Sequence, residues 1–426
     1  MKVLIMSHNP ITDYNSMGKT FLGLFSAFSE DELCQFYVYP TLPNIKVCES
    51  YYRMTDREAL RSIVRRGSAG RRISDSEIKR ENTLYEDENA SKMYRGKGSH
   101  KELKILVRDA IWKLSAWKNP HLAAWLAEER PDVIFAAPGA SGFFYRLILR
   151  TAEMCGIPIV TYVCDDFYFS SQSKRGLVGR FYARYIRRKI ETLMRASRHV
   201  VTISDELARD YAAAFGCACT VISTGANLKN APAACCGDGK ILSYFGNLQL
   251  GRYRSLAEVA RAVDAYNAAH GDHVTLNIYT ADTSPQITAA FEGAACVRFC
   301  GFLSADKMCE EMKKASVLLH VESFEEENRE RVKYSVSTKI ADSLASGICL
   351  FAYGPEGISS IEYLRRNACA SVAVNREELT DKLSECLENP EIRTEKASRA
   401  LEIAALNHDS GRQSERLKSI LSRALL

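Results

Sequence analysis

The sequence predicts an α/β protein made of two doubly wound units, each built on a parallel sheet. The 426 residues suit two domains of ordinary size. Short runs rich in β-branched residues alternate with longer segments of helical period, as in parallel sheets with crossover helices. The alternation restarts near residue 241. A composition of 46% hydrophobic and 26% charged residues excludes a disordered or fibrous polymer.

The first half of the chain predicts one domain, at residues 1–228. Its strands are expected at residues 3–7, 35–39, 133–137, 159–163, 200–204 and 220–223. Residues 50–110 are rich in charges of both signs and poor in apolar runs, so an inserted surface segment with helices is expected there. A linker is expected at 227–240, where Pro, Gly and Ala replace the periodic pattern.

The second half predicts a second domain, at residues 240–405. Its strands are expected at residues 241–246, 275–280, 297–302, 317–322, 349–353 and 371–374. Helical segments separate them, among them residues 255–267 and 305–314. From about residue 377 the pattern is helical, and residues 406–426 are expected to form a last helix of their own.

Targeting and redox signals favour the cytoplasm. No stretch approaches the roughly 18 uninterrupted apolar residues of a membrane-spanning helix. The opening MKVLIMSHNP fits a strand and a polar turn rather than a signal peptide. The 14 cysteines, including the neighbours Cys235 and Cys236, lack a His/Cys cluster at zinc spacing. We therefore expect reduced thiols, no metal site and a cytoplasmic protein.

Candidate site residues follow the predicted strands, because ligands of doubly wound sheets bind beyond the carboxyl ends of the strands. Two facing units would hold a ligand in the cleft between them. After the first strand, Gly18 stands in a polar loop that is expected to enter a helix near Phe21. A glycine there lets the backbone approach a ligand, although the spacing is not that of a phosphate loop. An ordinary turn is the alternative interpretation.

Two adjacent carboxylates, Asp165 and Asp166, follow the strand expected at 159–163. Repulsion between them, or burial, can raise the pKa of one. One of the two can instead cap the following helix. The spacing, without a further carboxylate cluster, argues against a divalent-metal site.

In the second domain, Arg252 and Arg254 stand just before the helix expected at residue 255. A helix N-terminus favours anions, so a basic side chain beside it indicates an anion site. Side chains two residues apart diverge in an extended loop. One of the two arginines is therefore expected to be solvated.

The segment 334–347 is the most informative. Ser337, Thr338 and Lys339 stand at a helix start, where free N–H groups and the Lys339 ammonium can form a cradle for a diphosphate. Asp342, one turn further, is expected to accept hydrogen bonds from ribose hydroxyls. Gly347 marks the end of this helix.

Taken in order, these segments resemble the family 4 retaining glycosyltransferases. The resemblance is carried by residues 157–166, 201–206, 222–227, 244–247 with Arg252, and 342–347, and it covers most of the chain outside residues 45–125. It implies a GT-B fold with two Rossmann-like domains facing a cleft. The nucleotide-sugar donor would bind the C-terminal domain, with Gly246 and Asn247 among its contacts, and the acceptor would bind the N-terminal domain. The last helix would cross back to the first domain.

The sequence departs from the family pattern in two places. Asp165-Asp166 stands where His-Asp is usual, so Asp165 replaces the His that contacts the donor sugar. The family also carries two Glu separated by seven residues. The second matches Asp342, which implies a ribose contact, and the first falls on Tyr334.

The resemblance implies retaining transfer of a sugar from a nucleoside-diphosphate sugar to a glycan or glycolipid hydroxyl, in cell-surface polysaccharide synthesis. Arg252 and Lys339, with the amides of Ser337 and Thr338, would stabilise the leaving diphosphate. Asp165 would contact the donor sugar or the acceptor hydroxyl, and no metal or other cofactor would be required. The alternatives are a GT-B epimerase that acts on the donor alone, and a catalytically silent relative that binds a nucleotide sugar or a partner enzyme.

A basic segment bears on a further partner. Residues 171–200 hold nine Lys/Arg against the single acid Glu191, a balance of 9 − 1 = +8 beside a whole-chain net charge of +5. A helix over 177–194 with one buried face and one solvated basic face is one interpretation. Contact of residues 174–198 with an anionic membrane surface that carries a lipid-linked acceptor is the other. No motif supports nucleic-acid binding.

Overall fold

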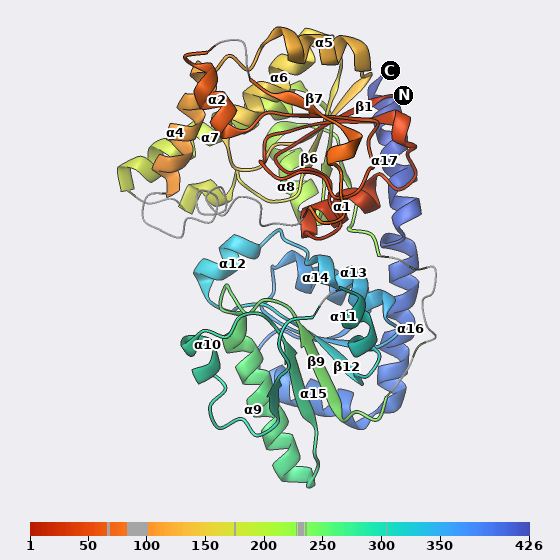
Figure 1. Ribbon diagram of the computed structural model, residues 1–426. Helices are drawn as coiled ribbons and strands as arrows, with labels where there is room; N and C mark the ends of the chain where they lie inside the picture. Colours follow the sequence, from red (N-terminus) through yellow and green to blue (C-terminus); the bar gives the residue numbers. More distant parts are fainter. Residues whose placement is uncertain are drawn as a thin grey trace. The chain divides into compact units, whose positions relative to one another are not determined.

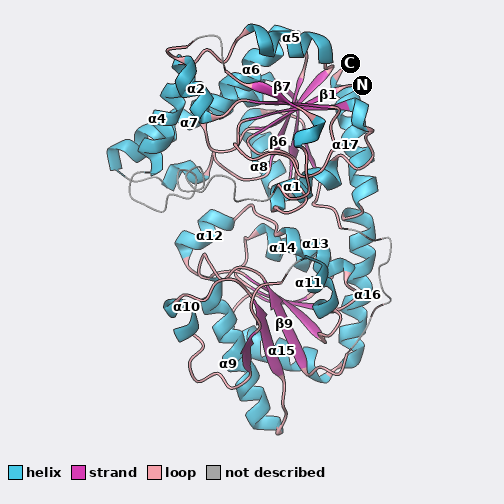
Figure 2. Ribbon diagram, viewed as in Figure 1, coloured by secondary structure: helices cyan, strands magenta, loops and turns pink. Residues whose placement is uncertain are grey.

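The computed structural model describes residues 1–65, 69–82, 101–173, 176–226, 228, 234, 237–303 and 305–426. The chain forms two compact units. Unit 1 comprises Met1–Ser223 and Ser410–Leu426, and unit 2 comprises Thr224–Asp409. In each unit, helices cover a central sheet (Figure 1, Figure 2). The prediction of two doubly wound α/β units is confirmed.

Some predicted features fall outside the described residues. They are most of the linker at 227–240, part of the charged segment (66–68 and 83–100), Lys174 and Arg175 of the basic segment, and the Cys235-Cys236 pair.

Unit 1 contains an eight-stranded sheet in the order β4-β3-β2-β1-β5-β6-β7-β8. Its strands are β1 Val3–Ser7, β2 Leu33–Tyr37, β3 Ser50–Arg53, β4 Arg71–Ile73, β5 Val133–Ala137, β6 Ile159–Val163, β7 Ser197–Thr202 and β8 Cys219–Val221. All neighbouring pairs are parallel except the antiparallel pair β3–β4 at the edge. Buried parallel strands explain the continuous apolar runs of β1 and β5.

Eight α-helices of unit 1 are described. They are α1 Ser16–Leu24, α2 Asp56–Ser62, α4 Lys101–Leu114, α5 Pro120–Glu129, α6 Gly142–Cys155, α7 Gly176–Ala196, α8 Asp205–Phe215 and α17 Ser410–Ala424. The last of these, α17, packs against α1 and the sheet. Its Leu417, Ile420 and Leu421 are buried in the same core as Val3 and Phe135. The end of the chain therefore completes the core of unit 1.

The prediction of a surface insertion at 50–110 is wrong for its first part. β3 extends the main sheet, and its Tyr51 and Tyr52 are buried. The Tyr51 hydroxyl accepts from the backbone N–H groups of Val47 at 2.9 Å and Cys48 at 3.0 Å, which closes the turn before the strand. A strand this short leaves no periodic signal beside charged neighbours.

Unit 2 contains a six-stranded parallel sheet in the order β11-β10-β9-β12-β13-β14. The strands are β9 Ile241–Phe245, β10 Thr275–Tyr279, β11 Val297–Phe299, β12 Val317–Val321, β13 Cys349–Tyr353 and β14 Ser371–Ala373. The helices are α9 Arg252–His270, α10 Pro285–Ala289, α11 Ala305–Met312, α12 Glu326–Val332, α13 Thr338–Ala345, α14 Ser359–Arg366, α15 Arg376–Glu388 and α16 Pro390–Asn407. Hydrophobic clusters fill the space between the sheet and the helices on its two faces.

Two helices begin earlier than the sequence predicts, and both starts bear on candidate residues. α1 begins at Ser16, because the Asn15 side chain caps it by accepting from the N–H of Gly18 at 2.7 Å. Gly18 is thus inside the first turn and not in the preceding loop. α9 begins at Arg252, after Gly251 in the left-handed region at φ 75°. Arg252 and Arg254 are therefore helical.

Three properties of the described residues bear on function. Twelve cysteines are described, and all are free thiols. Across the described part of the chain, no helix is both long and apolar enough to cross a membrane. Among the same residues, no group of three or more His, Cys, Asp or Glu is arranged to hold a metal ion.

Candidate active site

The main candidate site is a polar pocket in unit 2, at the point where the strand order reverses. β9 and β12 are neighbours at the centre of this sheet. β10 and β11 follow outward from β9 on one side, and β13 and β14 follow outward from β12 on the other. Such a point leaves a crevice beyond the carboxyl ends of the two strands. The polar lining residues are Gly246, Asn247, Arg252, His320, Ser337, Lys339 and Ser343.

The start of α13 forms one wall of this pocket. Ser337 is the N-cap, and its hydroxyl accepts from the backbone N–H of Lys339 at 3.4 Å. Ser337 and Lys339 both line the pocket, so the positive end of the helix and one ammonium group face the same space. Thr338 and Asp342 are not among the described residues that line it. Asp342 is half-buried on α13.

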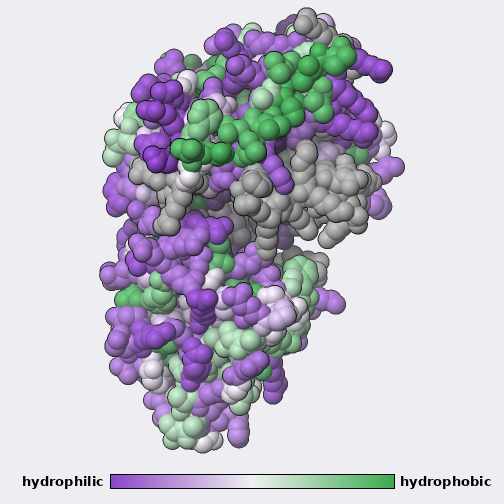
Figure 3. Space-filling model, turned by 90° about the vertical axis from the view of Figure 1, so that its left-hand side faces the viewer, coloured by the Kyte–Doolittle hydropathy of each residue, from purple (hydrophilic) through white to green (hydrophobic). Residues whose placement is uncertain are grey.

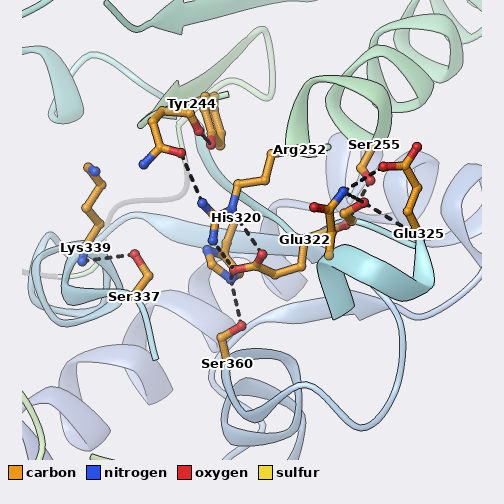
Figure 4. Close-up of polar contacts among 12 residues, drawn as sticks. Tyr244, Arg252, Ser255, His320, Glu322, Glu325, Ser337, Lys339 and Ser360 are labelled. Carbon is orange, nitrogen blue, oxygen red and sulfur yellow. Dashed lines mark hydrogen bonds and ion pairs between the residues drawn. The ribbon is translucent and has the colours of Figure 1, made fainter. Parts of the chain in front are cut away.

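Arg252 forms the opposite wall and is held by two groups (Figure 4). Its Nε and Nη2 each donate to Glu322 at 3.0 Å, and its Nη1 donates to Asn247 Oδ1 at 3.1 Å. The side chain of Glu322 is 3% exposed and that of Arg252 is 16% exposed. Burial alone would lower the pKa of Arg252, but the charge and hydrogen bonds of Glu322 raise it. The guanidinium therefore remains charged and fixed in orientation.

The ion pair of Arg252 and Glu322 depends on a close approach between the backbone at Gly251 and the segment after β12. A Cβ at Gly251 would lie 2.4 Å from Ser323 Oγ and 2.8 Å from Glu325 Oε2, so only glycine fits between α9 and the segment after β12. Ser255 Oγ donates to the main-chain carbonyl of Glu322 at 2.8 Å. The start of α9 is thus fastened to the end of β12.

His320, on β12, lies beside this ion pair. Its Nε2 is 3.2 Å from Ser360 Oγ and 3.5 Å from Glu322 Oε1. Burial lowers the pKa of His320 to about 4, although the Glu322 carboxylate opposes this shift. His320 is therefore neutral at pH 7, and the two cationic groups of the pocket are Arg252 and Lys339 among the residues that the structure describes.

Arg254 lies outside the pocket. Its guanidinium pairs with Glu325, and both side chains are exposed, at 56% and 40%. The expectation that one of the two arginines is solvated agrees with this arrangement, although the reason is the helical spacing of α9 and not an extended loop.

In unit 1, the two carboxylates that follow β6, Asp165 and Asp166, have different surroundings. Asp166 accepts backbone N–H bonds from Tyr168 at 2.9 Å, Phe169 at 3.0 Å and Ser170 at 2.7 Å. Asp166 therefore holds the following turn, as the capping interpretation requires. Asp165 makes no such bond among the described residues and lines a pocket with Tyr145.

Asp165 is an exposed residue that lines this pocket. Desolvation by the surrounding protein raises its pKa to about 6, and the charge of the adjacent Asp166 adds to the shift. Asp165 is thus a carboxylate that titrates near neutrality beside aromatic side chains, a combination typical of reactive sites.

Gly18 belongs to unit 1 and not to the unit 2 pocket. A Cβ at this position would lie 2.0 Å from the main-chain oxygen of Thr12. The absence of a side chain at Gly18 thus makes room for the backbone at Thr12 and not for a ligand.

Three residues beside these pockets were not predicted as site residues. Glu322 and His320 lie within the strand expected at residues 317–322, without a predicted role. His8 follows β1, and its Nε2 donates to the carbonyl of Pro138, just after β5, at 2.7 Å. Burial lowers the pKa of His8 to about 3, so the ring is neutral. The signal in each case was a titratable residue at a strand end.

Comparisons with known proteins agree with this architecture. The family model described as Glycosyltransferase Family 4 matches residues 85–230, and a second model, described as glycosyl transferase-like, matches residues 277–419. HepE from Anabaena, solved with UDP and glucose, is 13% identical, with 99% of this chain and 100% of that chain covered and a TM-score of 0.61. No curated protein matches the chain significantly in sequence.

Two further solved structures have the same fold. A UDP-forming α,α-trehalose-phosphate synthase from Burkholderia vietnamiensis is 12% identical, with 99% and 100% of the chains covered and a TM-score of 0.62. WaaG, a glycosyltransferase involved in lipopolysaccharide biosynthesis, is 14% identical, with 99% of each chain covered and a TM-score of 0.54.

The fold of the chain is that of the GT-B glycosyltransferases, and both family models that match it describe glycosyltransferases. Within that class, the match over residues 85–230 confirms the resemblance to family 4.

Proposed function

We propose that the chain transfers a sugar, with retention of configuration, from a nucleoside-diphosphate sugar to a hydroxyl of a growing glycan or glycolipid in the cytoplasm. The observation that carries this proposal is the unit 2 pocket, where Arg252, Lys339 and the start of α13 meet at the strand reversal. Two cations and a helix N-terminus are suited to a diphosphate.

In the proposed reaction, the barrier lies in departure of the diphosphate and in positive charge on the sugar ring. Arg252, Lys339 and the N–H groups at Ser337 and Thr338 stabilise the charge that grows on the leaving group. Asp342 binds the ribose, and Gly246 and Asn247 line the donor pocket. The proposal assigns the leaving-group charge to these groups, without a metal ion or another cofactor.

Asp165 is the proposed contact to the donor sugar or the acceptor hydroxyl. As a carboxylate it would stabilise the positive charge that develops on the ring, and the leaving phosphate would take the acceptor proton.

The donor can be identified by a thermal-shift screen of UDP-, GDP-, ADP-, CMP- and dTDP-linked sugars, because a ligand that binds the native state raises its stability. The UDP in the Anabaena HepE structures makes UDP-sugars the first set to test. Hydrolysis of the donor, and the anomeric configuration of the product formed with an acceptor, then test the reaction. A changed sugar formed from donor alone would support the epimerase, and binding without turnover would support the silent relative.

We further propose that unit 1 contacts an anionic membrane surface through α7, so that the enzyme reaches a lipid-linked acceptor. Arg180, Arg184 and Arg188 are exposed on this helix. Arg187 is held by Tyr168, whose hydroxyl lies 3.0 Å from its Nη2. The charge of the exposed arginines complements anionic lipid headgroups.

Exposed apolar side chains accompany these arginines. Of the 14 large hydrophobic side chains exposed among the described residues, eight lie on or next to α2, α4 and α7: Leu60, Val64, Leu103, Val107, Leu114, Leu177, Val178 and Phe181. α4 packs against both α2 and α7. Figure 3 shows a band of hydrophobic side chains on this side of unit 1. Apolar and basic groups on one surface are typical of interfacial binding.

The test of this contact is Phe181→Trp, because Phe181 is 63% exposed and the native Trp112, Trp117 and Trp125 are buried. Its fluorescence should shift to the blue with vesicles that contain phosphatidylglycerol and not with pure phosphatidylcholine. Phe302→Trp, at a position that is 78% exposed in unit 2, is the matched control. Absence of both the shift and co-sedimentation would remove the membrane from the proposal.

A further inference from the structure

The ion pair of Glu322 and Arg252 is largely enclosed by protein, and its carboxylate is the more deeply buried partner. Arg252 lines the pocket, whereas Glu322 is not among the described residues that do. The carboxylate therefore contacts the guanidinium from the side away from the ligand space. Figure 4 shows Lys339 and Ser337 on one side of Arg252 and Glu325 on the other.

Glu322 is itself fixed in place. Its main-chain N–H donates to the carbonyl of Tyr353 at 3.0 Å, and its own carbonyl accepts from Ser255. The neighbouring His320 is neutral at pH 7, so Arg252 is the charged partner of Glu322 among the described residues. The acid is thus a buried, rigid charge with one cationic partner.

This arrangement determines what Arg252 can offer a ligand. A guanidinium has five N–H donors, and three are used by Glu322 and Asn247. Two remain, in an orientation that exists before a ligand arrives, which lowers the cost of binding. The formal charge of the group formed by Arg252, Lys339 and Glu322 is 2 − 1 = +1, and not the +2 of the two cations alone.

We propose that Glu322 is a positioning residue for Arg252 and that its buried negative charge limits the affinity of the pocket for nucleoside diphosphate, so that the product is released. This inference rests on the proposed function. An enzyme whose site holds the diphosphate too strongly is limited by product release. Glu322 keeps the arginine oriented for the transition state and weakens its attraction for the product.

The experiment separates charge from geometry with two substitutions. Glu322→Gln keeps the shape of the side chain and removes the charge, whereas Glu322→Asp keeps the charge but is one methylene too short for the bidentate contact. Affinities for UDP and for inorganic pyrophosphate are measured by calorimetry, and kcat and KM are measured with the donor found in the screen. Glu325→Gln, in the exposed pair beside the pocket, is the matched control.

Glu322→Gln should bind both probes about 3- to 30-fold more tightly, because a full charge a few ångströms behind the guanidinium is removed. Its kcat and its donor KM should fall together. Glu322→Asp should show a lower kcat without tighter binding, and Glu325→Gln should behave as the wild type. Unfolding temperatures of all variants identify any loss of folding.

Two outcomes would overturn the inference in different ways. If the wild type binds UDP and pyrophosphate but Glu322→Gln binds them equally or more weakly, Glu322 has no role in release and the proposed function stands. If the wild type binds none of UDP, GDP and pyrophosphate, the donor pocket and this inference fall together.

Discussion

The replacement of Asp165 by Asn distinguishes a reacting carboxylate from a structural one. The change keeps the shape of the side chain and removes its charge. If the ionised Asp165 stabilises the developing positive charge, turnover should fall by about 10² or more, while donor affinity stays within a few-fold.

The pKa of Asp165 also predicts how strongly the activity depends on pH. The pKa of Asp165 is raised to about 6, so its ionised fraction rises from about one tenth at pH 5 to about nine tenths at pH 7. If the carboxylate is the active form, kcat/KM should rise about tenfold across this interval. The rise should be absent in Asp165→Asn. Initial rates of donor turnover between pH 4.5 and 8 measure both effects.

Asp166→Asn is the matched comparison, because Asp166 accepts three backbone N–H bonds in the turn after β6. It should lower the free energy of unfolding by about 1–3 kcal/mol, as expected for weakened bonds to a charged acceptor. Removing its charge should also move the rise in kcat/KM to lower pH, because that charge contributes to the raised pKa of Asp165. A profile that is unchanged in Asp165→Asn and lost in Asp166→Asn would refute the assignment.

Three further predictions concern charged groups. Arg252→Ala leaves the Glu322 carboxylate buried without its partner, so the free energy of unfolding should fall by about 3–5 kcal/mol in urea titrations. The double variant Arg252→Ala with Glu322→Ala should recover part of that loss without recovering diphosphate binding. Lys339→Ala should weaken UDP binding by about 10- to 150-fold in calorimetry, and UMP binding much less. Arg254→Ala, the control, should bind UDP as the wild type does. If Lys339→Ala binds UDP as tightly as the wild type, α13 is not part of the donor site. Arg184→Glu with Arg188→Glu should greatly reduce co-sedimentation with anionic vesicles, as should added salt, and unchanged sedimentation would leave a solvated basic helix.

The strands were predictable because buried parallel strands are continuous apolar runs between turn signals. Residues 349–353 form β13 with the predicted bounds, and the six strands of unit 2 all lie where the sequence places them. β3 was missed because its four residues, Ser50–Arg53, are too few for a period to emerge beside charged neighbours. Helix starts were missed where the cap was a single residue, as with Asn15 and Gly251.

Part of the candidate site was also predictable, because strand ends of one sheet meet at one edge. That rule brought Gly246, Arg252 and Lys339 into one pocket. It could not identify Glu322, since its pairing with Arg252 spans 70 residues and depends on the close approach at Gly251. Nor could the rule distinguish the roles of Asp165 and Asp166, because the direction of each side chain depends on the turn that follows.

The return of α17 to unit 1 has a consequence for synthesis. Leu417, Ile420, Leu421 and Ala424 belong to a core whose other buried members come from the first 223 residues, and the 186 residues of Thr224–Asp409 lie between the two groups. At a translation rate of about 5–20 residues per second, that core stays open for about 10 to 40 s after its main part has been made. During this interval the nascent first unit exposes an apolar groove that α17 later fills. Unit 2, whose sequence is continuous, can fold first although it is made second.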